Sequence, residues 1–289
     1  SLRLDLSKST GSALRENHYN LGLLYDSNIN QGFRADTIAY FGLPFKADPE
    51  SKPKAGIGYQ LDLSHQSTWF ISDKRAIGLS LNADSNDFSG SVGDNYSTRL
   101  QANLHHTQGR HTNINIGRKW YQGDELFDFA SFGFLANKQF KPTLNFFVAL
   151  QLGIYDYQRL DNHSGDFIGS SFGFRFPDRS VSSLHLKLSK YRAEDPVFSF
   201  TEIASGVQFS FPKKLIERIG INVMQRDYKL MMIEFFKKRD DEIYNVSFDL
   251  RDLKILSRNI KVRLVYEKSN SNIDIYKRDG WSILFIRQL

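Results

Sequence analysis

The feature that most constrains this chain is a repeated alternation of apolar and polar residues. Stretches in which every second residue is apolar recur from Tyr19 to Leu289. In residues 76–83, for example, Ile77, Leu79 and Leu81 alternate with small or polar residues. Successive side chains point to opposite faces of a strand, so each stretch predicts a β-strand with one apolar and one polar face.

The alternation predicts about fourteen strands. Each is close to the nine to eleven residues that a tilted strand needs to cross a bilayer. The predicted strands are residues 18–25, 57–64, 76–83, 97–106, 111–119, 126–138, 144–155, 167–176, 181–190, 200–211, 219–227, 243–251, 260–268 and 281–289.

The gaps between these stretches alternate between short and long. The short gaps are rich in Gly and Pro, which favour turns, and are residues 107–110, 140–142, 177–179 and 212–214. The long gaps are more polar and are residues 26–56, 84–96, 156–166, 192–199, 228–242 and 269–280. Short turns at one end and long loops at the other are typical of bacterial outer-membrane barrels.

We therefore predict an all-β, transmembrane, antiparallel up-and-down β-barrel with short periplasmic turns and long extracellular loops. Residues 18–289 would form the barrel, and residues 1–17 a linker or lead-in segment. The predicted location is the outer membrane of a Gram-negative bacterium, with outer-membrane lipid as a partner. A soluble sandwich or propeller would also have many short strands, but it gives no reason for loop lengths to alternate.

Composition excludes several other classes. The 289 residues contain no cysteine, which excludes disulfide scaffolds and thiolate chemistry. No apolar run is long enough for a transmembrane helix. The net charge is +6, but Lys and Arg are spread along the chain, so we expect no nucleic-acid partner.

No motif for catalysis or cofactor binding is present. The sequence lacks a Gly-x-Ser-x-Gly elbow and the glycine-rich phosphate loops. His105 and His106 are adjacent, so a strand would point them to opposite faces, away from a shared metal. We expect no enzyme activity, no cofactor and no metal site.

Polar residues on the inner faces of the predicted strands are the candidates for a substrate path. Several are amides, and the basic ones could form a cationic wall that guides an anionic or unfolded polypeptide. The candidate residues are Gln101, Asn103, Asn113, Asn115, Lys187, Lys261 and Arg263.

Several short motifs resemble one known family. They are residues 25–30 and 56–61, residues 119–123, and residues 240–245 and 266–276 near the end of the chain. On these motifs the chain resembles the surface lipoprotein assembly modulators along its whole length. The motif positions singled out by the resemblance are Asp26, Asn28, Asn30, Tyr59, Tyr244, Asn245, Asn270, Asn272 and Tyr276.

The resemblance implies a fourteen-stranded barrel that helps lipoproteins or related secreted proteins to reach the cell surface. It also implies a periplasmic tetratricopeptide-repeat domain before the barrel in the full-length protein. Substrate would pass through the lumen or through the seam between the first and last strands. A passive porin or a polysaccharide-export barrel remains an alternative, and a barrel enzyme is a third.

Overall fold

A computed structural model describes residues 13–288, with gaps at 73, 91, 107–108, 178–179, 212–213 and 251–259. Fourteen strands form one closed barrel. They are β1 (Ala13–Asp26), β4 (Gly56–Ser72), β5 (Arg75–Phe88), β6 (Asn95–His106), β7 (Arg110–Tyr121), β8 (Asp124–Lys141), β9 (Leu144–Tyr157), β10 (Gly165–Arg175), β11 (Val181–Ala193), β12 (Phe200–Ser210), β13 (Ile216–Met232), β14 (Lys237–Leu250), β15 (Ile260–Ser271) and β16 (Arg278–Gln288).

The first loop, residues 27–55, is called L1 here. It contains a separate two-stranded sheet of β2 (Thr37–Tyr40) and β3 (Leu43–Lys46), followed by the short 3-10 helix η1 (Pro49–Ser51). Four further 3-10 turns lie in other loops: η2 (Asp161–His163), η3 (Pro196–Phe198), η4 (Ile233–Phe235) and η5 (Asp274–Tyr276).

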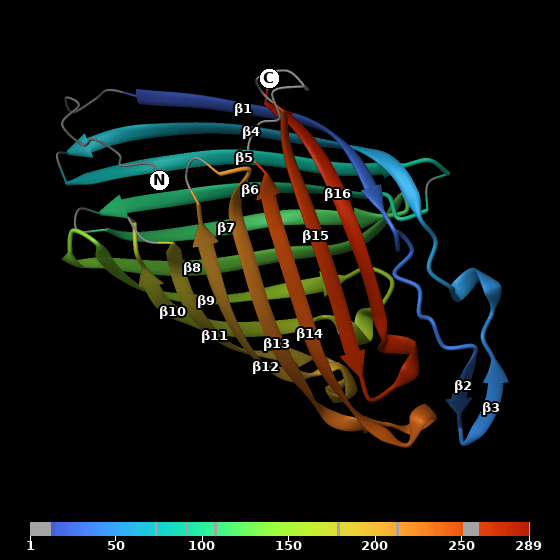
Figure 1. The fold of residues 1–289 in the computed structure, drawn as a ribbon. Coiled ribbons are helices and arrows are strands. Elements are labelled where there is room, and N and C mark those ends of the chain that lie inside the picture. The colour runs from blue at the N-terminus through green and yellow to red at the C-terminus, as the bar shows by residue number, and fades with distance from the viewer. Residues whose placement is uncertain are drawn as a thin grey trace.

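Each barrel strand pairs antiparallel with its neighbours in chain order, and β1 pairs with β16 to close the sheet (Figure 1). The predicted antiparallel up-and-down barrel is therefore confirmed. Closure removes the unpaired sheet edges that lipid could not hydrogen-bond. No helix in the described part of the chain is long and apolar enough to cross a membrane.

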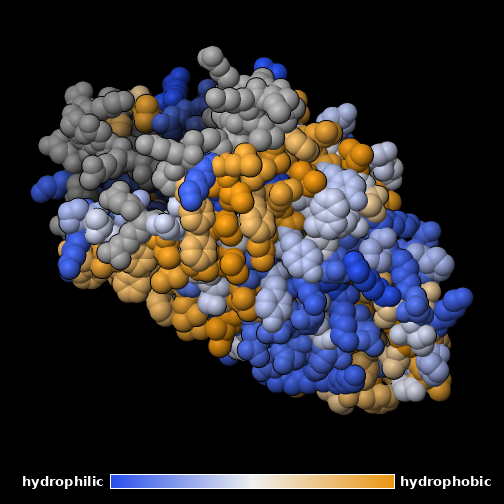
Figure 2. Space-filling model, viewed as in Figure 1, coloured by the Kyte–Doolittle hydropathy of each residue, from blue (hydrophilic) through white to orange (hydrophobic). Residues whose placement is uncertain are grey.

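The apolar face of the sheet points outward. Ile77, Leu79 and Leu81 on β5 are all exposed, whereas Ser80 between them is buried on the inner side. Figure 2 shows the resulting orange band across the barrel wall. A soluble protein rarely exposes such an area, so lipid is the environment that this surface fits.

The strands continue beyond the ends that alternation predicts. β13 runs to Met232 and β14 begins at Lys237, so the predicted gap 228–242 becomes a short tip. Beyond the apolar band, outward positions such as Asp227 are charged, so the alternation of apolar and polar residues ends there. The two strands nevertheless remain paired. β1 likewise begins at Ala13, inside the predicted lead-in; residues 1–12 lie outside the described part.

The two ends of the barrel differ. β1 starts and β16 ends at the end that we call the turn end, and L1 extends from the opposite, loop end (Figure 1). Outer-membrane barrels place short turns in the periplasm and longer loops outside the cell. The turn end is therefore periplasmic and the loop end extracellular.

Candidate functional site

The strand register places each of the seven predicted lumen residues opposite other inward-facing residues. All seven therefore lie on the inner face of the sheet. Four of them form one patch of amides. Gln101 is opposite Asn115, and Asn103 is opposite Asn113. Gln101 Nε2 donates to Asn103 Oδ1 at 2.7 Å, and Asn115 Nδ2 donates to Asn113 Oδ1 at 2.8 Å. This wall of β6 and β7 is polar and uncharged at these positions, and its amides are engaged with one another.

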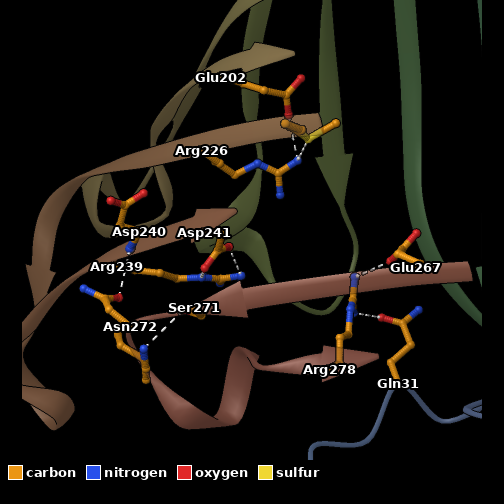
Figure 3. Close-up of polar contacts among 12 residues, drawn as sticks. Gln31, Glu202, Arg226, Arg239, Asp240, Asp241, Glu267, Ser271, Asn272 and Arg278 are labelled. Carbon is orange, nitrogen blue, oxygen red and sulfur yellow. Dashed lines mark hydrogen bonds and ion pairs between the residues drawn. The ribbon is translucent and has the colours of Figure 1, made fainter. Parts of the chain in front are cut away.

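Lys187 belongs to an ion-pair cluster on the opposite wall. Its Nζ lies 2.9 Å from Glu202 Oε1, and Arg226 Nη2 lies 2.8 Å from Glu202 Oε2. The Glu202 side chain is only 4% exposed, so both cations are needed to compensate its charge. Figure 3 shows Glu202 and Arg226 facing each other from β12 and β13.

A second ion pair lies nearer the loop end. Arg239 holds Asp241 with both nitrogens, Nε to Oδ1 at 3.0 Å and Nη2 to Oδ2 at 2.6 Å (Figure 3). The Arg239 guanidinium also lies over the rings of Tyr228, at 4.5 Å, and of Tyr276, at 3.4 Å. Tyr276 is in η5, and burial raises the pKa of its phenol. Arg239 therefore ties β13, β14 and η5 together.

The remaining predicted basic positions lie on β15. Arg263 Nε donates to Asp249 Oδ1 at 2.7 Å, and Arg218 lies 3.4 Å from the same carboxylate. Lys261 is on the same face, opposite Ile286 of β16. Since Lys187 and Arg263 are both paired with carboxylates, charge on this wall is locally compensated. Two of the three basic residues of the predicted cationic wall, Lys187 and Arg263, therefore lie in ion pairs.

Aromatic rings form a continuous series on the inner wall from β8 to β13. Neighbouring ring centroids lie 5.1 to 6.2 Å apart, distances at which aromatic pairs attract. The series is Phe127, Tyr155, Tyr191, Phe200 and Tyr228. Arg226 lies over Phe200 at 4.4 Å. Aromatic and charged residues therefore share the inner wall from β8 to β14, which begins beside the amides of β6 and β7.

Among the described residues, the seam between β1 and β16 has the shortest strand pairing of the barrel. Seven residue pairs join these strands, from Asn20–Gln288 to Asp26–Ser282. Every other neighbouring pair is joined by ten to fourteen described residue pairs. Among the described residues, the turn-end part of β1, 13–19, pairs with β4 and has no partner on β16.

L1 reinforces the other end of this seam. Ser27 N donates to Trp281 O at 3.0 Å, and Trp281 N donates to Ser27 Oγ at 2.8 Å. Arg34 forms an ion pair with Asp279 at 2.8 Å. Arg278 donates to Gln31 and faces it across the seam in Figure 3. Among the described residues, L1 therefore holds the seam together at its loop end.

Asn28 and Asn30 hold L1 in this position. Asn28 Nδ2 donates to Gly32 O and to Asp279 O, at 3.0 and 3.2 Å, and its Oδ1 accepts from Gly32 N at 2.7 Å. Asn30 Nδ2 donates to Lys52 O at 2.7 Å. Asp26 accepts from Asn28 N at 2.7 Å. These family-like positions therefore fix the start of L1.

Between these residues, Ile29 is inserted into the barrel. It packs with Leu24 of β1 and Phe88 of β5 in a buried apolar cluster. A cavity of about 240 Å³ lies beside this part of L1 at the loop end of the seam. Its lining includes Asp26, Asn28, Gln31, Glu267, Arg278 and Asp279.

The other family-like positions are divided between the two faces. Tyr59, Tyr244 and Asn270 lie on the outer face, whereas Asn245 lies on the inner face opposite Glu267. Asn272 Nδ2 donates to Lys238 O at 2.7 Å, and its Oδ1 accepts from Asp240 N at 3.0 Å. Asn272 therefore fixes the β15–β16 loop to β14 (Figure 3).

Several important residues were not singled out by sequence. Glu202, Arg226 and Arg239 lie on the inner face of β12–β14. The alternation of side-chain direction along each strand is enough to predict this from the sequence. Nothing in the sequence shows which cation meets which carboxylate, because those contacts depend on register across strands. In the described residues, no group of three His, Asp or Glu side chains is arranged to hold a metal ion.

Comparison with known proteins identifies the family. A profile described as "Surface lipoprotein assembly modifier" matches residues 17–286, nearly the whole chain. The chain belongs to the surface lipoprotein assembly modifier family. This confirms the resemblance drawn from the motifs. A search of curated proteins finds no match to this family member.

Solved structures resemble this surface lipoprotein assembly modifier in fold. OccAB4 from Acinetobacter baumannii has a TM-score of 0.57 at 9% identity, covering 98% of this chain and 99% of that one. OpdQ from Pseudomonas aeruginosa has 0.55 at 8%, covering 95% and 97%. A BenF-like porin from Pseudomonas fluorescens Pf-5 has 0.54 at 7%, covering 97% and 99%. The fold and family together indicate the Gram-negative outer membrane.

Proposed function

We propose that this chain is an outer-membrane barrel that assists the transfer of lipoproteins or related secreted proteins to the cell surface. Family membership is the observation that carries the proposal. The partners are outer-membrane lipid, a lipoprotein or secreted cargo, and a tetratricopeptide-repeat domain upstream in the full-length protein. The proposal involves no enzymatic step and no cofactor.

The short seam supports a route for cargo. Fewer backbone hydrogen bonds must break between β1 and β16 than between any other described neighbours. Each hydrogen bond contributes about 1 kcal/mol net, so the paired strands themselves separate at least cost here once the contacts of L1 with β16 are released. The polar inner wall, including the predicted lumen residues, would then contact an extended chain.

The direct test uses proteoliposomes that contain the full-length protein and a lipoprotein encoded beside its gene. Protease added outside should digest the cargo only when the barrel is present. If the cargo stays protected although the barrel is folded and correctly oriented, the proposed function is wrong.

A crosslinking test addresses the seam. The chain has no cysteine, so a Leu23→Cys, Phe285→Cys pair across β1 and β16 can be oxidised cleanly. Leu150→Cys with Ser170→Cys, across β9 and β10, is the matched control. Oxidation of the seam pair should stop export and reductant should restore it. Normal export through a fully crosslinked seam would restrict the route to the lumen.

The alternative function is a passive porin or a polysaccharide-export barrel. The likeness to a solved structure named as a BenF-like porin favours this alternative, although at 7% identity it shows only the fold. Single-channel recording discriminates, because a porin gives a large, steady conductance. A silent barrel is expected for the assembly function.

A further inference from the structure

Two loops meet at the extracellular tip and expose aromatic and aliphatic side chains. The β2–β3 hairpin of L1 contacts η4 between β13 and β14: Phe41 N donates to Glu234 O at 2.6 Å, and the rings of Tyr40 and Phe235 lie 5.8 Å apart. We call the resulting surface the tip patch; it comprises Tyr40, Phe41, Leu43, Ile233, Phe235 and Phe236.

The tip patch is strongly exposed. The exposed fraction is 51% for Phe41, 61% for Leu43 and 64% for Ile233. Contiguous apolar patches on a water-facing surface mark interaction sites. An isolated exposed leucine would need no explanation, but these residues come from two loops distant in sequence and are held together by ring contacts.

Backbone conformation determines how two rings of the tip patch are presented. Phe41 and Phe236 both have positive φ, 49° and 50°. This left-handed region is unfavourable for bulky residues and usually holds Gly, Asn or Asp. Phe41 and Gly42 form the two-residue turn of the β2–β3 hairpin, and Phe236 is the left-handed cap that ends η4. These conformations present two phenylalanine rings, 6.4 Å apart, at the surface.

Lipid does not cover the tip patch. On β13 and β14 the outward positions between the apolar band and the tip include Asp227, Asp240 and Glu242. Figure 2 shows a separate tan-to-orange area at the lower right, where β2 and β3 lie in Figure 1, with blue atoms between it and the main orange band. A hydrophilic zone therefore separates the tip patch from the membrane.

The charges around the tip patch indicate the chemistry of its partner. Residues 37–46 and 229–238, which form the tip itself, contain four lysines and a single acidic residue, Glu234, whereas Asp227, Asp240 and Glu242 lie nearer the membrane. Lys46, Lys229, Lys237 and Lys238 are all exposed, although Lys238 also pairs with Asp227 at 2.7 Å. An apolar surface with a basic rim fits apolar side chains flanked by acidic ones.

We propose that the tip patch binds an extended, acidic polypeptide segment with exposed apolar side chains, as offered by cargo that reaches the cell surface unfolded. This inference rests on the proposed export function for its biological partner. Folded proteins bury their apolar residues, so the tip patch would bind unfolded chain and release it on folding.

The test measures binding directly. The probe is fluorescent, reduced and carboxymethylated α-lactalbumin, a permanently unfolded acidic polypeptide, titrated with the full chain in detergent. The variant is Phe41→Asn with Phe236→Asn, because asparagine tolerates positive φ and the loops keep their backbone. Leu160→Asn, at an exposed leucine in the β9–β10 loop, is the matched control.

The native protein should bind the unfolded probe, and the double variant should bind about tenfold more weakly or worse, as for loss of aromatic anchors. Leu160→Asn should bind as the native protein does, and added salt should weaken binding. Equal binding by the double variant, or equal binding of folded α-lactalbumin, would overturn the proposal. Attachment to anionic vesicles, or self-association, that is lost in the double variant would overturn it too.

This assay needs no transport. Failure of probe binding therefore removes the tip patch proposal alone, and failure of cargo exposure in proteoliposomes removes the export function alone.

Discussion

Replacing Asn28 with alanine should release L1 from the barrel wall while leaving the barrel folded. The substitution removes three hydrogen bonds that join L1 to itself and to β16. Asn28 is only 9% exposed, so water replaces these bonds incompletely. At about 1 kcal/mol for each bond, the folded and docked start of L1 should weaken by about 2–3 kcal/mol, which is a roughly 30- to 160-fold change in its opening equilibrium.

Hydrogen exchange at the Ile29 amide measures this opening. Ile29 N donates to Lys54 O at 2.8 Å and joins the two ends of L1, so its exchange requires the start of L1 to open. The exchange rate should rise by the same factor as the opening equilibrium, because exchange of a protected amide follows its open population.

Asn103→Ala is the matched control for this experiment. Asn103 is also 9% exposed, but it lies in β6 and accepts a hydrogen bond from Gln101, away from L1. Exchange at Ile29 should be unchanged in the control. A change of less than about threefold in Asn28→Ala, well below the roughly 30-fold expected from lost hydrogen bonds, would refute the role of Asn28 in docking L1.

Two further predictions concern the ion-pair cluster and the outer loops. Glu202→Gln should lower the free energy of unfolding by about 3 kcal/mol, measured in urea and detergent, because Lys187 and Arg226 lose their buried partner; a loss below about 1 kcal/mol, the size for exposed pairs, would contradict this. Burial in the β9–β10 loop, with Phe198 stacked at 3.7 Å, lowers the pKa of His163. The unfolded imidazole therefore protonates first, so the loop loses stability as pH falls below about 6.5, and an NMR titration giving a pKa of 6.5 or above would refute it.

The barrel can be predicted from the sequence because one requirement, an apolar outer face, dominates its strands. Lipid accepts only apolar side chains on the outer face, so alternation is strict across the membrane, as in Ile77, Leu79 and Leu81. Outside the bilayer that requirement ends. Lys238 and Asp240 therefore lie on β14, although the sequence alone predicts a loop at these residues.

The candidate site is harder to predict from sequence. The alternation along each strand predicts that Lys187 and Arg263 face the lumen. Their ion pairs, however, depend on which strands are neighbours and on the register between them. The motif asparagines show the same limit. Asn28 contacts Asp279, 251 residues away in the chain, and no local pattern predicts that contact.

Charge compensation inside the barrel bears on the choice between an export barrel and a porin. Selective pores present rings of like charge that remain available to a passing ion. Here Glu202, Asp241 and Asp249 each lie within 3.0 Å of a lysine or arginine nitrogen. Such pairs exert little net field on a small ion, whereas paired charges, amides and aromatic rings together suit the mixed side chains of a polypeptide. We therefore expect weak ion selectivity in any open state. The measurement is a reversal potential in a salt gradient, which should be near zero.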